Sequence, residues 1–390
     1  MLTAAFCGGL GLASSAATSS SSLPEAAEPA ERLRRNRLRR RLGPDAADDT
    51  IMVPDAPGAR ANRTHAGELF RFALVTDSHY WAASGGRRLF QATSDAKTVR
   101  DGLLVSDTPQ TYAALLADLK RFAAPPSNGA FAIHAGDSVC GGSTFHASPA
   151  EYEAQLRAVV SMERAALGRW PVYRVPGNHD LHPTPGLGLQ LWRQTLGNGS
   201  AVGYRSLVRS GWRLLLLDFL DGQTSDTDGH GHVGEAQLRW LDRQLAESEA
   251  LGEQVILVGH QLLVQPTDVH GHAASWYLPS EDSVDNAEAV LAVLRRYSHV
   301  RLSLHGHVHA NSLTMQSGVA FVSSAAAAEF PMQWREVTVR PCELELRSRF
   351  LDLPTLRSKS AARDTRPGRN EAKRGGALDN LVTIRTCAAP

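Results

Sequence analysis

The sequence has little cysteine, little net charge and no long apolar run, and each shortage excludes a class of protein. Four cysteines in 390 residues are too few for a disulfide framework. The 41 basic and 40 acidic residues leave a formal net charge of +1, which provides no electrostatic footprint for nucleic acid. No stretch of about 18 apolar residues is present, so we expect no membrane-spanning helix. A globular protein remains, and 43% hydrophobic residues are enough for a sizeable core.

The two ends of the chain differ in composition from its middle. Residues 1–65 combine a Ser-rich stretch with a basic run, and we expect a low-complexity segment that is disordered or serves targeting. Residues 353–390 are rich in Arg, Lys, Ser and Gly, so we expect a disordered basic tail. The compartment stays open: a cytoplasmic or organellar location is favoured over secretion, which the weak signal-like stretch at residues 1–20 would allow.

Between these ends, five short apolar runs are each followed by a block of Asp, Asn, His and Gly residues. The blocks are Asp77-Ser78-His79, Gly136-Asp137, Gly177-Asn178-His179-Asp180, Gly259-His260 and Gly306-His307-Val308-His309. The runs before them have the character of buried strands. Because ligands collect at the carboxyl ends of strands in open α/β sheets, we predict that the blocks converge on one rim.

The residue types in these blocks are those that bind metal ions. Imidazole suits zinc and iron, whereas carboxylate and amide oxygens also suit manganese and magnesium. A carboxylate can bridge two cations, and two metals about 3.5–4 Å apart can clamp the attacking and leaving oxygens of a displacement. A lone Asp or His after a strand is more often a turn residue, but that reading would have to hold five times in succession. The blocks therefore predict two metal sites that share one carboxylate.

The segments between the strand-like runs predict helices on the outside of a sandwich. Amphipathic stretches begin with helix-start signals at Thr108-Pro109, at Ser148-Pro149 and at Gly234-Glu235. Alternating apolar and polar residues at 336–346 predict a closing antiparallel hairpin. We expect an α/β fold in which two mixed sheets lie face to face.

The order of the five blocks resembles the calcineurin-like metallophosphoesterase superfamily, whose pattern is D-x-H, GD, GNH-D/E, GH and G-H-x-H. The resemblance implies a metallophosphoesterase domain at residues 66–352, folded as a four-layer α-β-β-α sandwich of two mixed sheets. It also implies two divalent or mixed-valence metal ions, with manganese, iron and zinc as the candidates.

The resemblance also implies a role for each residue of the blocks. The first metal would be held by Asp77, His79 and His309, the second by Asn178, His260 and His307, and Asp137 would bridge them. A hydroxide between the metals would be the nucleophile, since metal binding lowers the pKa of water. His179 would lie outside the ligand set and assist the departing oxygen as a proton donor or stabilise the transition-state charge, and Asp180 would orient its imidazole.

The motif is closest to class III cyclic nucleotide phosphodiesterases, and it fits two related groups less well. Purple acid phosphatases have a ligating tyrosine where this chain has Cys140, and the cyclic nucleotide enzymes often have an acidic residue there. Manganese-dependent nucleotide-diphosphate hydrolases have glutamine where this chain has His79. We therefore predict a phosphodiesterase acting on cyclic nucleotides or similar diesters. The alternatives are a phosphomonoesterase or nucleotide-pyrophosphate hydrolase, and a catalytically silent scaffold of the same fold.

The remaining expectations concern the substrate, the partners and the cleft. The predicted partner is a small phosphorylated substrate, for which a nucleotide is one candidate, with no specific nucleic acid; the oligomeric state stays open. Tyr80 and Trp81 follow the first block, where packing is favoured over stacking on a nucleobase. Residues 221–233 and 265–285 are candidate loops over the cleft.

Overall fold

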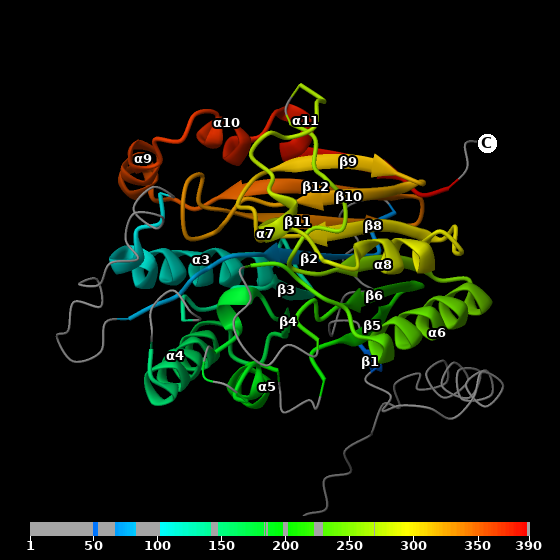
Figure 1. The fold of residues 1–390 in the computed structure, drawn as a ribbon, viewed down its shortest axis with the longest axis horizontal. Helices are drawn as coiled ribbons and strands as arrows, with labels where there is room; N and C mark the ends of the chain where they lie inside the picture. Colours follow the sequence, from blue (N-terminus) through cyan, green and yellow to red (C-terminus); the bar gives the residue numbers. More distant parts are fainter. Residues whose placement is uncertain are drawn as a thin grey trace, which may run out of the picture. The chain divides into compact units, whose positions relative to one another are not determined.

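Two mixed β-sheets lie at the centre of the part of the chain that the structure describes (Figure 1). The computed structural model describes residues 50–53, 67–82, 102–141, 147–182, 184, 186–197, 202–221, 229–268 and 270–387. All of them belong to the unit Ala46–Pro390, which is described here by itself. The signal-like stretch and the basic run expected near the N-terminus lie outside the described residues, as do residues 222–228 of one expected cleft loop.

The two sheets contain seven and six strands. In spatial order, the seven-stranded sheet consists of β1 (Thr50–Met52), β5 (Arg205–Arg209), β6 (Trp212–Leu216), β7 (Gln254–Val258), β8 (Val300–His305), β10 (Val319–Ser323) and β9 (Ser312–Gln316). The six-stranded sheet consists of β13 (Leu381–Arg385), β12 (Glu343–Phe350), β11 (Gln333–Arg340), β2 (Phe70–Val75), β3 (Phe131–Ala135) and β4 (Val172–Val175). The neighbours from β6 to β10 are parallel, as are β2, β3 and β4, whereas β11, β12 and β13 pair antiparallel.

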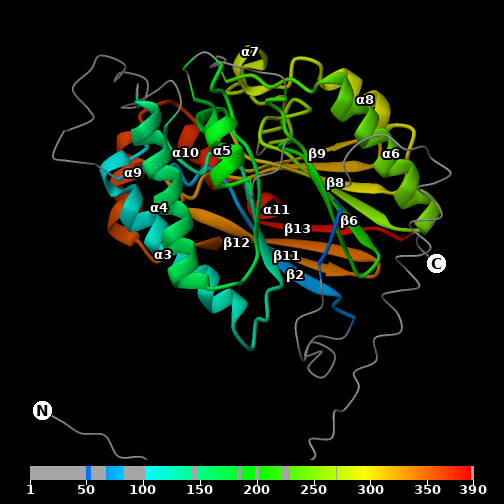
Figure 2. The ribbon, with the colours of Figure 1, turned by 90° about the horizontal axis from the view of Figure 1, so that it is seen from below.

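Helices α3 (Thr108–Ala123) and α4 (Pro149–Leu167) cover the outer face of the six-stranded sheet, and α6 (Glu235–Leu251) and α8 (Ala287–Leu294) cover that of the seven-stranded sheet. The other described helices are α5 (Gln190–Thr195), α7 (Pro279–Asp282), α9 (Pro354–Arg363), α10 (Arg369–Arg374) and α11 (Ala377–Asn380), with 3₁₀ turns at Val105–Asp107 and Asn178–Asp180. Figure 2 shows α3 and α4 beside the six-stranded sheet, and α6 and α8 beside the seven-stranded sheet. The predicted α-β-β-α layering is confirmed. None of the described helices is long and apolar enough to cross a membrane.

The strand sequences explain why the central strands of both sheets bury both of their faces. On β2, Phe72 and Leu74 enter the core between the sheets, whereas Ala73 and Val75 face the core under the outer helices. On β6, Leu214 lies in the core between the sheets. Because side chains alternate between the faces of a strand, a continuous apolar run supplies both cores. These runs therefore form central strands.

The helices α3 and α4 begin where the sequence signals predict, but the Thr108 hydroxyl does not cap its helix. Ser148 caps α4, as predicted, and Glu151 completes a capping box with it. Helix α3 begins at Thr108, but the Thr108 hydroxyl donates to the carbonyl of Val105, 2.9 Å away, and accepts from the amide of Trp81. The hydroxyl therefore fixes the Trp81 segment instead of capping its own helix.

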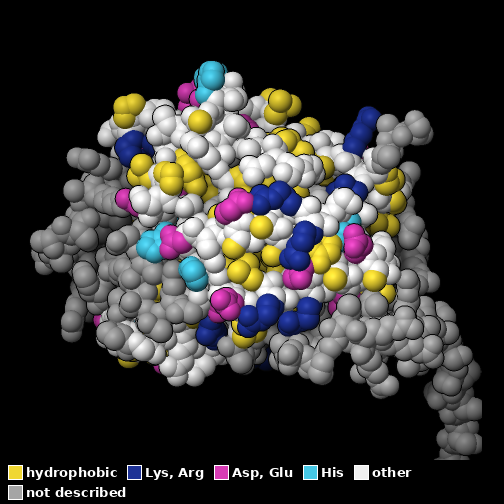
Figure 3. Space-filling view, turned by 45° about the vertical axis from the view of Figure 1, so that its right-hand side comes forward, with side chains coloured by type: hydrophobic (Ala, Val, Ile, Leu, Met, Phe, Trp, Pro, Cys, Tyr) yellow, Lys and Arg dark blue, Asp and Glu magenta, His cyan; other side chains and the backbone are white. Residues whose placement is uncertain are grey.

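Acidic and basic side chains lie side by side, with apolar ones between them, over the described part of the face shown in Figure 3. This mixing agrees with the near-zero net charge of +1. Over this described part of the face, the charges do not form a field of one sign that could steer a polyanion.

The expectation of a disordered tail after residue 353 is wrong for residues 354–385. This segment forms α9, α10, α11 and β13, and β13 pairs with β12 from Glu343 opposite Arg385 to Arg347 opposite Leu381. A disulfide joins Cys342 to Cys387, so two of the few cysteines are paired. The expectation rested on the charge-rich composition of the whole segment. It overlooked a short strand with alternating buried and exposed residues, in which Val382 and Ile384 reach the core between the sheets.

The N-terminal boundary of the fold also differs from the expected one. Strand β1 (Thr50–Met52) lies within the expected low-complexity segment and pairs in parallel with β5. Three residues are too few to give a periodic signal in the sequence. The partner strand, which is distant in sequence, decides that they are a strand.

We expect Val382→Asp to lower the free energy of unfolding by about 3 kcal/mol or more, because an unpaired carboxylate would enter the apolar core. The matched control is Thr383→Asp, on the exposed side of the same strand, which should change it by about 1 kcal/mol at most. Urea unfolding of the full chain measures both. Equal, small effects would mean that β13 does not contribute to the core.

Candidate metal centre

The five sequence blocks lie at the carboxyl ends of strands from both sheets. The six-stranded sheet contributes the loops after β2, β3 and β4, and the seven-stranded sheet contributes those after β7 and β8. Hydrogen bonds join the loops: the Asp77 amide donates to the Gly136 carbonyl at 3.1 Å, and the Gly306 amide donates to the His260 carbonyl at 3.0 Å. The His307 amide donates to Asp77 Oδ2 at 3.1 Å, so loops from different sheets meet directly.

The backbone at this rim is held in an uncommon conformation. Nine described residues other than glycine have positive φ, and five of them belong to the blocks: Asp77, His79, Asp137, His307 and His309. Their φ values lie between 42° and 68°, in the left-handed region that asparagine, aspartate and histidine enter more readily than most residues. At Gly177, a Cβ atom would collide with the Asp137 carboxylate, so only glycine permits this approach. Such strain is retained where the surrounding structure over-determines it.

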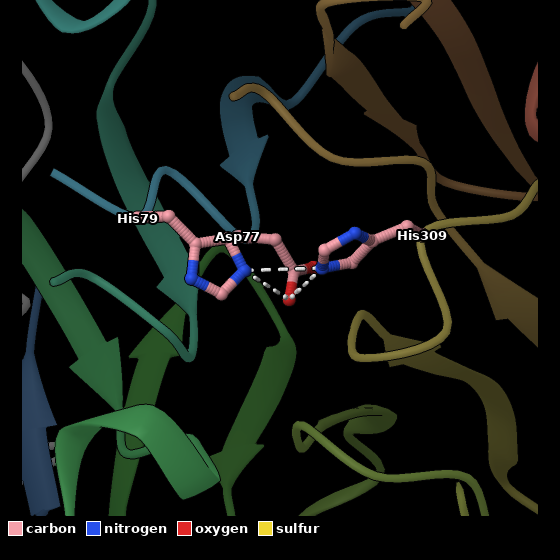
Figure 4. Close-up of side chains that lie close together, drawn as sticks. All are labelled: Asp77, His79 and His309. Carbon is pink, nitrogen blue, oxygen red and sulfur yellow. Dashed lines mark hydrogen bonds and ion pairs between the residues drawn. The ribbon is translucent and has the colours of Figure 1, made fainter. Parts of the chain in front are cut away.

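Asp77, His79 and His309 form one group of side chains that could hold a metal ion (Figure 4). His309 Nε2 lies 3.2 Å from Asp77 Oδ1 and 3.1 Å from His79 Nε2. His309 Nδ1 lies 2.8 Å from Glu329 Oε1, which leaves Nε2 to face the other two side chains. Two ring nitrogens and a carboxylate oxygen that face one another need a proton or a cation among them.

Asp137, His260 and His307 form a second such group. His260 Nε2 lies 3.1 Å from Asp137 Oδ2, and His260 Nδ1 lies 2.7 Å from the Ala135 carbonyl. His307 Nε2 lies 3.0 Å from the Glu281 carbonyl, so Nδ1 is its remaining ligand atom. Backbone carbonyls thus fix the rings of both histidines by their second nitrogen, which is the usual device at metal sites.

The Asp137 carboxylate lies between the two groups. Its Oδ2 is 3.8 Å from His79 Nε2 on one side and 3.1 Å from His260 Nε2 on the other. Its Oδ1 accepts a hydrogen bond of 2.8 Å from the His179 amide. This is the position that a bridging carboxylate requires.

Several ligand atoms in these loops have the environment of metal ligands. Within the described part of the chain, Asp77 Oδ1, Asn178 Oδ1 and His260 Nε2 are buried without a hydrogen-bond partner. An unsatisfied buried polar atom is costly, and a cation is one way to satisfy it. The mixed nitrogen and oxygen donors suit manganese, iron or zinc. The residues of both groups therefore fit a pair of metal ions.

The electrostatics of the cluster also favour positive charge. Burial opposes a charge on His260, but Asp137 and Asp77 raise its pKa to about 9. Burial likewise opposes a charge on His309, yet Asp77 and Glu329 raise its pKa to about 10. Metal binding displaces protons from such ligands. The neighbouring carboxylates thus attract protons or metal ions to these imidazoles.

His179, which we predicted to lie outside the ligand set, lies beside the cluster. Its ring is 5.0 Å from that of His79, edge to face, and His79, Asp137 and His179 form a third group that could hold a metal ion. Unlike His79 and Asp137, His179 is only partly buried. The geometry therefore allows contact with a substrate as well as with a metal.

Asp180 has a different use from the one we predicted. Its carboxylate is fully buried and accepts hydrogen bonds from the amides of Gly177 at 3.0 Å, Ser138 at 3.1 Å and Val139 at 3.3 Å. Burial and the nearby Asp137 raise the Asp180 pKa to about 7. Asp180 thus ties the loop after β4 to the loop after β3, where amide groups are its partners.

The aromatic pair after the first block packs in the core, as favoured from the sequence. Tyr80 and Trp81 are buried beneath the α3 and α4 helices, and the Tyr80 ring packs at a tilt against that of Tyr112, with ring centroids 5.4 Å apart. Cys140 is buried in the same core. Sequence reasoning missed Glu329, because it lies in no block and no local pattern marks it as a partner of His309.

Comparison with known proteins finds the same family signature. A family model described as calcineurin-like phosphoesterase matches residues 70–311. The 3',5'-cyclic adenosine monophosphate phosphodiesterase CpdA of Escherichia coli K12 is 32% identical over 149 residues, which cover 38% of this chain and 46% of that protein. The manganese-dependent ADP-ribose/CDP-alcohol diphosphatase of Arabidopsis thaliana is 25% identical over 301 residues, which cover 67% of this chain and 88% of that protein.

Among solved structures, a dimetal phosphatase from Danio rerio aligns with a TM-score of 0.53 and 18% identity, over 73% of this chain and 96% of the other. At this identity the likeness concerns the fold. The part of the chain that aligns with the E. coli relative spans less than half of that protein's length.

We expect Asp137→Asn to reduce the Mn²⁺ retained by the full-length protein from about two ions per chain to about one or fewer, because a neutral amide lacks the negative charge that a carboxylate shares between two cations. Elemental analysis after dialysis measures the retained metal. The matched control is Asp218→Asn, a fully buried carboxylate that instead pairs with Arg193, and it should keep both ions. Two ions retained by Asp137→Asn would contradict the bridging role.

Proposed function

The chain belongs to the calcineurin-like phosphoesterase family, and from this premise we propose that it is a dinuclear metal-dependent hydrolase of phosphoric esters, with phosphodiesters such as cyclic nucleotides as substrates. The observation that carries the proposal is that two candidate ligand groups lie next to each other, with the Asp137 carboxylate between them. A protein-binding scaffold has no physical need for buried side-chain atoms such as Asp77 Oδ1, Asn178 Oδ1 and His260 Nε2 that lack a hydrogen-bond partner.

In this proposal, Asp77, His79 and His309 would hold the first metal, Asn178, His260 and His307 would hold the second, and Asp137 would bridge them. Divalent cations at such a centre supply Lewis acidity toward phosphoryl oxygens and lower the pKa of water toward neutrality. Manganese is the first ion to test, because the donor set admits it and the Arabidopsis relative is named as manganese-dependent.

The chain's own residues orient the ligands and handle a proton. The carbonyls of Ala135 and Glu281 fix the imidazoles of His260 and His307, each within 3.0 Å. Asp180 holds the loop that carries His179 through the Gly177 amide. His179, partly exposed beside His79, is placed to donate a proton to the departing oxygen or to stabilise its charge.

The choice of a diester substrate is supported by the cyclic nucleotide phosphodiesterase of E. coli. A second candidate is hydrolysis of a nucleotide pyrophosphate, because the match to the Arabidopsis diphosphatase covers 88% of that protein. Both substrates contain a phosphorus atom with two ester or anhydride links, so the same metal centre suits either. The loops around the rim, which differ between such proteins, decide between them.

We expect protein reconstituted with Mn²⁺ to hydrolyse 3',5'-cyclic AMP and bis(p-nitrophenyl) phosphate, and Asp137→Ala to abolish both activities. The panel also includes ADP-ribose and p-nitrophenyl phosphate. Turnover of ADP-ribose alone would select the second candidate, and turnover of the monoester alone would indicate a phosphatase. No turnover despite bound metal would contradict the proposal and favour a scaffold.

We expect His179→Ala to lower kcat by about 10²–10⁴-fold, the usual contribution of a general acid or base, while the bound Mn²⁺ stays unchanged. Steady-state kinetics and elemental analysis of the same preparation provide both values. The control is His299→Ala, a buried histidine bonded to Ser248 under α6. If His179→Ala instead loses metal but keeps turnover per bound ion, His179 is a ligand, as its position near His79 and Asp137 also allows.

A further inference from the structure

A buried chain of charged groups connects the C-terminal segment to the metal centre. Lys373 Nζ lies 2.7 Å from Glu329 Oε1, and the same oxygen lies 2.8 Å from His309 Nδ1. His309 Nε2 faces Asp77 Oδ1 at 3.2 Å, in the first ligand group. Two contacts therefore separate Lys373 from an atom that we assign to the first metal.

Lys373 and the two carboxylates that it contacts are removed from solvent. The side chains of Lys373, Glu329 and Asp364 are each 0% exposed, and Lys373 Nζ lies 2.6 Å from Asp364 Oδ2. Arg366 pairs with Asp364 at 2.8 Å, so the second carboxylate has a cation of its own. A charged amine is buried only with such partners, because an unpaired charge in the interior is very costly.

The helix that carries Lys373 is fixed to the loop that carries His307 and His309. The Asn311 amide donates to the Ala372 carbonyl at 3.0 Å, and Arg369 Nη2 donates to the Val308 carbonyl at 2.8 Å. Val308 lies between the two histidines in the sequence. Helix α10 is therefore attached to the backbone of the last block at Val308, and again at Asn311, two residues beyond that block.

Helix α9 fixes the other side of Glu329. The Ser360 hydroxyl accepts from the Phe330 amide at 2.8 Å and donates to the Gly102 carbonyl at 2.7 Å. Glu329 is thus held at its backbone by α9 and at its carboxylate by α10. Both helices lie outside residues 70–311, which the family model matches.

We propose that the C-terminal segment completes the first metal site, with Glu329 and Lys373 as positioning residues that fix His309. The inference rests on the metal centre of the proposed function. Glu329 holds the Nδ1 side of His309 so that Nε2 faces Asp77 and His79. Lys373 neutralises and locates the Glu329 carboxylate. A carboxylate behind a ligating histidine sets its tautomer and orientation and raises its basicity.

The test is Mn²⁺ binding to the full-length, metal-stripped protein, measured by calorimetry and by electron paramagnetic resonance, with no substrate present. Lys373→Met should weaken one of two Mn²⁺ sites by about 10–100-fold, the usual cost of losing such a partner, and leave the other unchanged. The matched control is Arg213→Met, which breaks another fully buried ion pair, with Glu253 at 2.8 Å, and should leave both sites unchanged.

A second variant separates positioning from folding. Glu329→Gln keeps the shape of the side chain and should weaken the same site as Lys373→Met. Because Lys373 acts through Glu329, the double variant should lose less affinity than the two single losses combined. If Lys373→Met does not fold, Glu329→Gln alone supplies the result: selective weakening of one site supports the inference, and unchanged binding overturns it.

The other outcomes are equally decisive. Unchanged Mn²⁺ affinity in Lys373→Met, equal weakening of both sites, or the same loss in Arg213→Met would each overturn the inference, because the lysine would then serve stability alone. Absence of Mn²⁺ binding by the unaltered protein would overturn it as well. Since binding is measured without hydrolysis, an inactive protein that shows the selective loss refutes the proposed activity and still supports the inference.

Discussion

The rest of this structure depends on the burial of Asp77 and Asp137 among histidines at the meeting point of two sheets. Two carboxylates in the interior repel each other and lose hydration, so they require cations or protons close by. His260 and His309 lie within 3.2 Å of these carboxylates. The strained backbone of the loops and the glycines beside them follow from this requirement, since they let five loops approach a common point.

The two-sheet architecture makes that approach possible. Parallel strands end at the same edge of a sheet, and the apolar core between the sheets holds the edges of both sheets together. The His307 amide that donates to Asp77 joins loops from different sheets. Stability and chemistry are therefore separated: the strand interiors supply burial, and the short loops after them supply polar groups.

The segment after residue 353 is part of the folded structure and is not a disordered tail. Its last strand adds to the six-stranded sheet, and its helices place charged groups beneath the rim. The buried Lys373 shows why composition misled: a segment rich in Lys and Arg can fold when its charges find partners inside the protein. The region that the family model matches, residues 70–311, is thus followed by a C-terminal segment that contacts its last block at Val308.

The sequence by itself determined the central strands, the helix starts and the set of polar residues that meets at the rim, because these depend on local periodicity and on short blocks such as Gly177-Asn178-His179-Asp180. It did not determine that Asp180 bonds to amides, that residues 381–385 form a strand, or that Glu329 and Lys373 stand behind His309. Only the tertiary structure decided these points, because each depends on a partner far away in the sequence, and no local pattern records which distant group a buried charge or an edge strand will meet.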